Sequence, residues 1–160
     1  MRDPARLVVA LVVATAVVVL DQFTKSKIVA ELAGGQPVVL INPWFRLEYA
    51  ENRGVAFGML SGNPWILATV ALAVLVLVTA HIRQRWSLQW AVVVAAGLTF
   101  GGAIANAWDR IRLGYVVDYI SIGSWPNFNI ADSAISLGVL LLVADVFLHP
   151  DPKPEALTNG

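Results

Sequence analysis

Apolar stretches long enough to cross a lipid bilayer constrain this chain more than any other feature. Four such stretches occur, at Leu7–Leu20, Trp65–Ile82, Leu88–Ala105 and Ile130–Leu148. A membrane-spanning helix needs about 20 mostly apolar residues, and the last three stretches meet this requirement nearly as they stand. The first is long enough only if its helix continues through Asp21-Gln22-Phe23-Thr24-Lys25, which places Asp21 and Lys25 one turn apart on one face.

The composition agrees with a membrane protein. Hydrophobic residues make up 58% of the chain and charged residues 14%, against about 25% charged residues in an ordinary soluble domain. We therefore predict a membrane α-helical fold with four transmembrane helices and a small extracytoplasmic β-hairpin or sheet region. The spans are expected at about 7–28, 65–82, 88–105 and 130–148, within one polytopic domain over residues 1–160.

The two long connections, 32–64 and 106–128, are expected on the same side of the membrane. In the first, the runs 38–41 and 45–49 flank a turn signal at Asn42-Pro43 and predict a hairpin. Apolar and charged residues alternate along 45–49, which is typical of a half-buried strand. In the second, a strand-like run over 115–122 is ended by Gly123-Ser124-Trp125-Pro126.

Positive charge near the spans predicts the orientation. Arg2 and Arg6 precede the first span, and Arg83 and Arg85 lie in the short turn between the second and third. Both termini are therefore expected in the cytoplasm and both long connections outside it. A cleavable secretory signal peptide is an alternative for the N-terminus, because Ala14-Thr15-Ala16 resembles a cleavage site. The three later spans require a membrane in either case.

Two aspartates mark the expected site. Asp118 lies in the strand-like run, and Asp132 begins the last apolar stretch. Carboxylates at membrane depth are costly and indicate function by default. Two of them at one interface suggest chemistry with a shared proton, and the apolar neighbours of Asp118 are expected to raise its pKa.

Each polar position also has a structural explanation. Asp132 follows Asn129 by three residues and fits the first turn of a helix capped by Asn129. Asp118 fits an ordinary strand end, and Asp109 with Arg110 fits an ion pair or a hydrogen-bond anchor. Gly97 and Gly101 form a small-xxx-small pattern that allows close helix packing.

Charge and composition exclude several other classes of function. The formal net charge is +0, and no basic cluster supports a nucleic-acid partner. The chain has no cysteine, which removes disulfides, thiolate metal sites and a cysteine nucleophile. We expect neither a metal nor another cofactor.

Five short segments in order resemble lipoprotein signal peptidase, the type II bacterial signal peptidase. They are Asp21-Gln22-Phe23-Thr24-Lys25, Asn52-Arg53-Gly54-Val55-Ala56-Phe57-Gly58, Asn106-Ala107-Trp108-Asp109-Arg110, Val117-Asp118-Tyr119 and Phe128-Asn129-Ile130-Ala131-Asp132-Ser133. The resemblance covers about Asp21 to Leu148. It departs from the family at Ala105, where glycine is expected, and at Ala107-Trp108, which replace an aliphatic pair.

The resemblance implies an aspartic endopeptidase of the bacterial cytoplasmic membrane, with its active site near the outer face. It implies that the enzyme removes the signal peptide of a prolipoprotein just before the cysteine that carries a diacylglyceryl group. The implied partners are lipid-modified prolipoprotein signal peptides and membrane lipid. Asp118 and Asp132 are the implied catalytic dyad. The implied supporting residues are Asp21, Lys25, Asn52, Arg53, Gly54, Asn106, Asp109, Arg110, Asn129 and Ala131.

Amide hydrolysis fits a pair of aspartates, because one ionised carboxylate can activate water while a protonated one supplies a proton. Two other classes of function remain as alternatives. A small proton-coupled transporter would also place carboxylates in helices, although it would line a path across the membrane. A non-catalytic membrane scaffold would account for Gly97 and Gly101 but leaves the carboxylates without a role.

Overall fold

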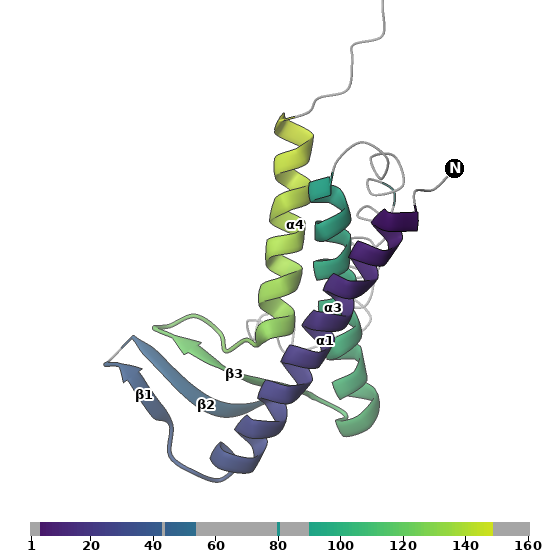
Figure 1. Ribbon diagram of the computed structural model, residues 1–160. Coiled ribbons are helices and arrows are strands. Elements are labelled where there is room, and N and C mark those ends of the chain that lie inside the picture. Colours follow the sequence, from purple (N-terminus) through teal and green to yellow (C-terminus); the bar gives the residue numbers. More distant parts are fainter. Residues whose placement is uncertain (1–3, 43, 54–79, 81–89, 149–160) are drawn as a thin grey trace, which may run out of the picture.

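The structure is a computed structural model that describes residues 4–42, 44–53, 80 and 90–148. In these ranges, three helices are long and apolar enough to cross a membrane. They are α1 (Pro4–Leu32), α3 (Trp90–Leu113) and α4 (Ile130–Leu148), and they lie side by side (Figure 1). The predicted span at 65–82 lies outside the described residues except for Ala80.

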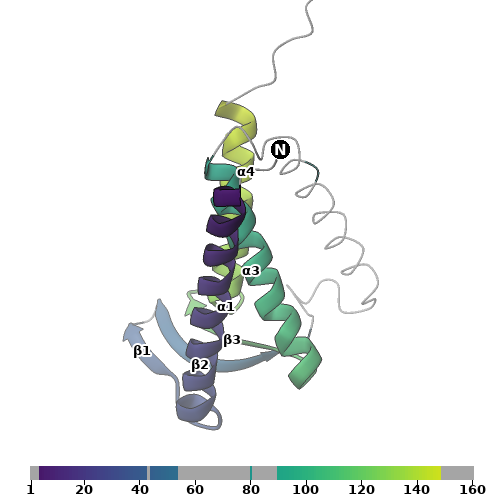
Figure 2. The same ribbon diagram turned by 45° about the vertical axis from the view of Figure 1, so that its right-hand side comes forward.

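Three strands form an antiparallel sheet in the order β1-β2-β3. They are β1 (Val38–Ile41), β2 (Phe45–Asn52) and β3 (Val116–Ile122). The sheet projects sideways from the end of the bundle where α1 finishes (Figure 2). The start of α1 and the end of α4 are both at the opposite end of the bundle (Figure 1). The predicted hairpin and the predicted third strand are therefore both present.

Small residues allow the helices to pack closely. A Cβ atom at Gly101 would lie 2.8 Å from the backbone of Ala14 on α1, and one at Gly97 would lie 2.7 Å from Val13. The predicted small-xxx-small contact is thus the interface between α3 and α1. On another face of α3, Gly102 approaches the backbone of Ala131 on α4. This second contact fixes the first turn of α4 against α3.

Two helices are longer than the predicted membrane spans. Helix α3 does not end near residue 105 but continues to Leu113, so the first part of the predicted connection is helical. The polar residues there suit a helix because Asn106 and Asp109 are buried and hydrogen-bonded to α1. Similarly, α1 extends beyond the predicted 7–28 at both ends.

Strand β2 also departs from the predicted alternation. All of its residues except Glu51 are partly buried. The strand lies between β1 and β3, and its register to β3 shifts between Leu47 and Ala50. An extra residue in one strand bends it and interrupts its alternation. The shift sets Ala50 opposite Asp118.

Candidate active site

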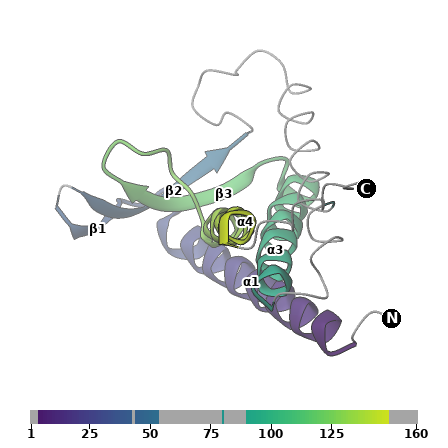
Figure 3. The same cartoon turned by 90° about the horizontal axis from the view of Figure 1, so that it is seen from above.

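The backbone brings Asp118 beside the start of α4. After β3 the chain turns at Gly123, whose φ is 55°, and returns so that Phe128 pairs with Ile120. The N–H groups of Tyr119 and Ile120 donate to the Phe128 carbonyl at 3.1 and 2.9 Å. The next residue is Asn129, which therefore lies against β3 just before the helix begins. Seen from above, α4 lies between β3 and α3 (Figure 3).

Asn129 connects the two aspartates. Its Oδ1 accepts the backbone N–H of Asp132 at 2.9 Å, while its own N–H donates to Oδ2 of Asp132 at 3.3 Å. This reciprocal pair is a capping box, so the predicted cap at Asn129 is confirmed. The other end of the same amide, Nδ2, donates to Oδ1 of Asp118 at 2.7 Å. One buried side chain thus spans the helix and the strand.

Two further asparagines also donate to the aspartates. Nδ2 of Asn52, at the end of β2, donates to Oδ2 of Asp118 at 2.9 Å. Nδ2 of Asn106 on α3 donates to Oδ1 of Asp132 at 2.7 Å. Every oxygen of both carboxyl groups therefore accepts a hydrogen bond.

Burial changes the acidity of Asp118. It raises the pKa of this carboxyl from 3.8 to about 6, against the opposing effect of the Asn52 and Asn129 hydrogen bonds. The negative charge of Asp132 raises it further. The predicted direction of the Asp118 pKa is confirmed, and its main cause is burial, as expected.

A buried ion cluster lies behind the aspartates. The Lys25 ammonium is 2.7 Å from Oδ2 of Asp21 and 2.8 Å from Oδ2 of Asp109, and it donates to Oδ1 of Asn106 at 2.9 Å. The predicted pair of Asp21 and Lys25 is therefore present. Asp21 also accepts the backbone N–H of Ala131 at 2.9 Å. Helix α1 in this way caps a second N–H of α4.

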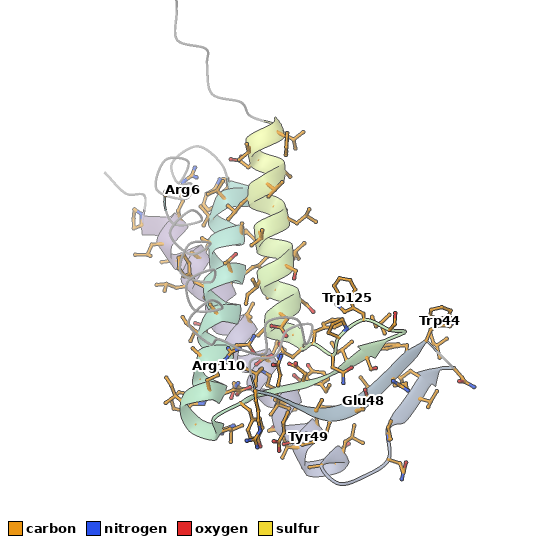
Figure 4. All side chains as sticks on the ribbon, turned by 180° about the vertical axis from the view of Figure 1, so that it is seen from behind. Arg6, Trp44, Glu48, Tyr49, Arg110 and Trp125 are labelled. Atoms are coloured by element: carbon orange, nitrogen blue, oxygen red, sulfur yellow. The ribbon has the colours of Figure 1, made fainter. Side chains whose placement is uncertain are left out.

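Asp109 is a hydrogen-bond anchor rather than a partner of Arg110. Its Oδ2 accepts the Val117 N–H at 3.3 Å, which ties α3 to β3. Its Oδ1 accepts from Gln22 at 2.8 Å. Arg110 is exposed and donates to the Asn106 carbonyl at 3.5 Å. It lies at the same end of the bundle as Tyr49, whereas Arg6 lies at the other (Figure 4).

Both aspartates face one cavity of about 480 Å³. Its described lining is Ala50, Glu51, Asn52, Arg53, Asp118, Trp125, Pro126, Asn127, Phe128 and Asp132. Arg53 lies on the rim, 72% exposed, and pairs with Glu51 at 2.9 Å. Gly54 lies outside the described residues. Most of the predicted site residues thus converge, with Arg53 and Arg110 towards the solvent.

Three supporting contacts were not predicted as part of the site. Gln22 bonds Asp109, Thr24 accepts the Tyr119 hydroxyl at 2.9 Å, and Asn127 donates to Glu48 at 2.9 Å. The first two residues are polar positions within an apolar helix, and such positions often face the interior of a bundle. That signal could have identified Gln22 and Thr24.

Comparison with known proteins decides the family. The family described as Signal peptidase (SPase) II matches residues 13–148. The chain belongs to the signal peptidase II family. This result confirms the predicted aspartic peptidase and decides against the transporter and the scaffold.

Relatives of this signal peptidase II member share most of its length. A lipoprotein signal peptidase of Chlorobium phaeobacteroides is 42% identical over 81% of the chain and 90% of its own length. One from Geobacillus kaustophilus is 37% identical, over 88% and 94%. A bacterial membrane enzyme solved by the in meso method superimposes with a TM-score of 0.70 at 30% identity, over 92% of both chains.

Proposed function

We propose that this membrane peptidase removes signal peptides from prolipoproteins with Asp118 and Asp132 as its catalytic dyad. The observation that carries the proposal is that both carboxyl groups face one cavity while sharing the Asn129 amide. Carboxyl groups placed in this way can hold one proton between them, because two adjacent carboxyl groups do not both ionise easily.

The chemistry needs one carboxylate and one carboxylic acid. The ionised member takes a proton from water, and the resulting hydroxide adds to the carbonyl carbon of the scissile bond. The protonated member hydrogen-bonds the carbonyl oxygen and stabilises its developing charge. When the tetrahedral intermediate collapses, the C–N bond breaks and the departing nitrogen takes up a proton from the dyad. No covalent bond to the enzyme forms.

The substrate enters from the lipid in this proposal. The cut falls just before a cysteine that bears a diacylglyceryl group. A peptide bond anchored to lipid in this way would reach a site at the end of the bundle without leaving the bilayer. Extracting the chains instead would cost about 0.8 kcal/mol per buried methylene. The partners are therefore lipid-modified prolipoproteins and the surrounding lipid.

We propose that the site lies at the outer face of the bacterial cytoplasmic membrane, with the two termini in the cytoplasm. Arg6 lies at the end of the bundle away from the cavity (Figure 4), which fits the positive-inside rule. The chain has no cysteine, so single Glu31→Cys and Ala5→Cys variants test this arrangement. In spheroplasts, a membrane-impermeant maleimide should label Glu31→Cys and spare Ala5→Cys. The reverse pattern would contradict the orientation.

The dyad is tested with purified Asp118→Asn and Asp132→Asn variants and a diacylglyceryl-modified prolipoprotein. Each variant should lose nearly all turnover because each lacks one of the two protonation roles. Asp145→Asn is a control on the same helix, far from the cavity. Mass spectrometry of the product should locate the new N-terminus at the lipidated cysteine. A folded dyad variant with turnover near that of the wild type would exclude the mechanism.

A further inference from the structure

Lys25 is the buried cation nearest to the proposed dyad in the described part of the chain, and it reaches Asp132 through another residue. It is 3% exposed. Two of its three N–H donors go to the carboxylates of Asp21 and Asp109, and the third goes to Oδ1 of Asn106. Asn106 in turn donates to Asp132. The path from the ammonium to the dyad is therefore a single side-chain amide.

The amide of Asn106 has only one favourable orientation. Its Oδ1 accepts from Lys25 at 2.9 Å and from Asn129 at 3.2 Å, while its Nδ2 donates to Asp132 at 2.7 Å. A half-turn of the amide would set Nδ2 against two donors and Oδ1 against a carboxylate oxygen. Because an amide nitrogen accepts no hydrogen bond, the ammonium of Lys25 forces a donor towards Asp132.

We propose that Lys25, by fixing the orientation of the Asn106 amide, is a positioning residue that makes Asp132 the ionised member of the dyad and leaves the proton on Asp118. This inference rests on the proposed function, because it assigns roles within that dyad. Hydrogen bonds donated to a carboxylate favour its charged form. Asp132 would then be the general base, and Asp118 would face the carbonyl oxygen.

The location of the two aspartates supports this assignment. Asp132 lies in the first turn of α4, where the helix dipole favours negative charge. Asp118 lies on a strand and has no helix terminus beneath it. Among the described residues, the charged groups around the pair are Asp21 and Lys25 on α1, Asp109 on α3, and the Glu51 and Arg53 pair on the β2 side of the cavity.

The pH profile of kcat/KM tests the assignment. The acid limb reports the group that must be ionised in the free enzyme. Asn106→Leu removes the donor to Asp132 and leaves the Lys25 ion pairs in place. We expect its acid limb to move to higher pH by about one unit, which corresponds to about a tenfold loss of kcat/KM on the acid side. Lys25→Met should move the limb in the same direction.

Controls separate this role from a general structural one. Lys27→Met changes an exposed lysine two residues along α1 and should leave the profile unchanged. Lys25→Arg retains a cation with N–H donors and should restore part of the acid limb. In the double variant Lys25→Met/Asn106→Leu, the shift should be clearly smaller than the sum of the two single shifts, because both changes break the path through Asn106.

The outcomes distinguish the inference from the proposal on which it rests. Should Lys25→Met not fold, Asn106→Leu still carries the test, since it keeps the buried ion cluster. An unmoved acid limb in folded Asn106→Leu, or additive shifts in the double variant, would overturn the role of Lys25. Those results would leave the dyad intact if Asp118→Asn and Asp132→Asn are inactive. Activity in either of these would instead remove the dyad itself.

Discussion

Replacing Asn129 by aspartate separates the two functions of its side chain. The variant keeps an oxygen to accept the Asp132 N–H, and aspartate caps helices as well as asparagine does. On the other side, however, the Nδ2 group becomes an oxygen. In the wild type it donates to Asp118 at 2.7 Å and, at 3.2 Å, to Oδ1 of Asn106 and the Val117 carbonyl. Asn129→Asp therefore preserves the start of α4 and turns a hydrogen bond to the dyad into a repulsion.

The expected loss follows from these contacts. Leaving the buried Asp118 carboxyl without this donor costs about 1 to 3 kcal/mol. A like charge about 4 Å away opposes the one negative charge that the dyad must carry by a further amount of about 4 kcal/mol at an effective dielectric constant near 20. The two effects are not additive, because the new carboxyl will take up a proton. We expect kcat to fall by at least about a hundredfold at neutral pH, which the hydrogen bond nearly accounts for alone.

The assay is turnover of a diacylglyceryl-modified prolipoprotein at saturating concentration, with thermal unfolding measured in the same detergent. Asn127→Asp is the matched control: it also converts an amide that donates to a carboxylate, here Glu48 at 2.9 Å, into a second acid. It should cost far less turnover. Equal losses of turnover in the two variants would refute the reasoning, because the effect would then not depend on contact with Asp118.

Three other predictions concern single contacts. Asn52→Leu removes the 2.9 Å hydrogen bond to Asp118 and should lower kcat/KM by about tenfold or more; an unchanged value would mean that this donor is dispensable. Gly101→Ala places a Cβ 2.8 Å from the Ala14 backbone and should lower the unfolding free energy by about 1 to 3 kcal/mol. Gly35→Ala is the control and should not lower it, because the atom nearest to its new Cβ is 3.4 Å away. Burial raises the folded-state pKa of Asp118 from 3.8 to about 6. Between these two pH values the native state binds more protons than the unfolded state, so the free energy of unfolding should fall as the pH rises from 3.8 to about 6. The midpoint of thermal unfolding should therefore vary less over this window in Asp118→Asn than in the wild type.

The sequence was most informative where a pattern depends on neighbours along the chain. Asn129 and Asp132 are three residues apart and form the expected capping box, and Asp21 and Lys25 form the expected pair one turn apart. The spacing of Gly97 and Gly101 likewise identified a helix contact. The partner helix was not predictable, because nothing local specifies that Ala14 lies opposite.

Contacts between distant segments were the ones that sequence reasoning missed. Asn106 and Asp109 looked like residues of a connection, since polar residues usually leave the membrane where a span ends. Their burial is possible only because Lys25 and Gln22 on α1 supply partners. In β2, the alternation of apolar and charged residues gave the strand but not the register shift between Leu47 and Ala50, which depends on the neighbouring strand.

The division of the two aspartates between a strand and a helix has a consequence for how this enzyme should be handled. Asp118 belongs to a sheet outside the apolar bundle, while Asp132 moves with α4, whose tilt depends on Gly102 and on the lipid that surrounds the helices. No single rigid element holds both carboxyl groups, and the hydrogen bonds of Asn129 connect them. A bilayer thickness or a detergent that changes helix tilt therefore changes the spacing of the two carboxyl groups. Turnover measured in short-chain and long-chain lipids then reports how sensitive the reaction is to that spacing.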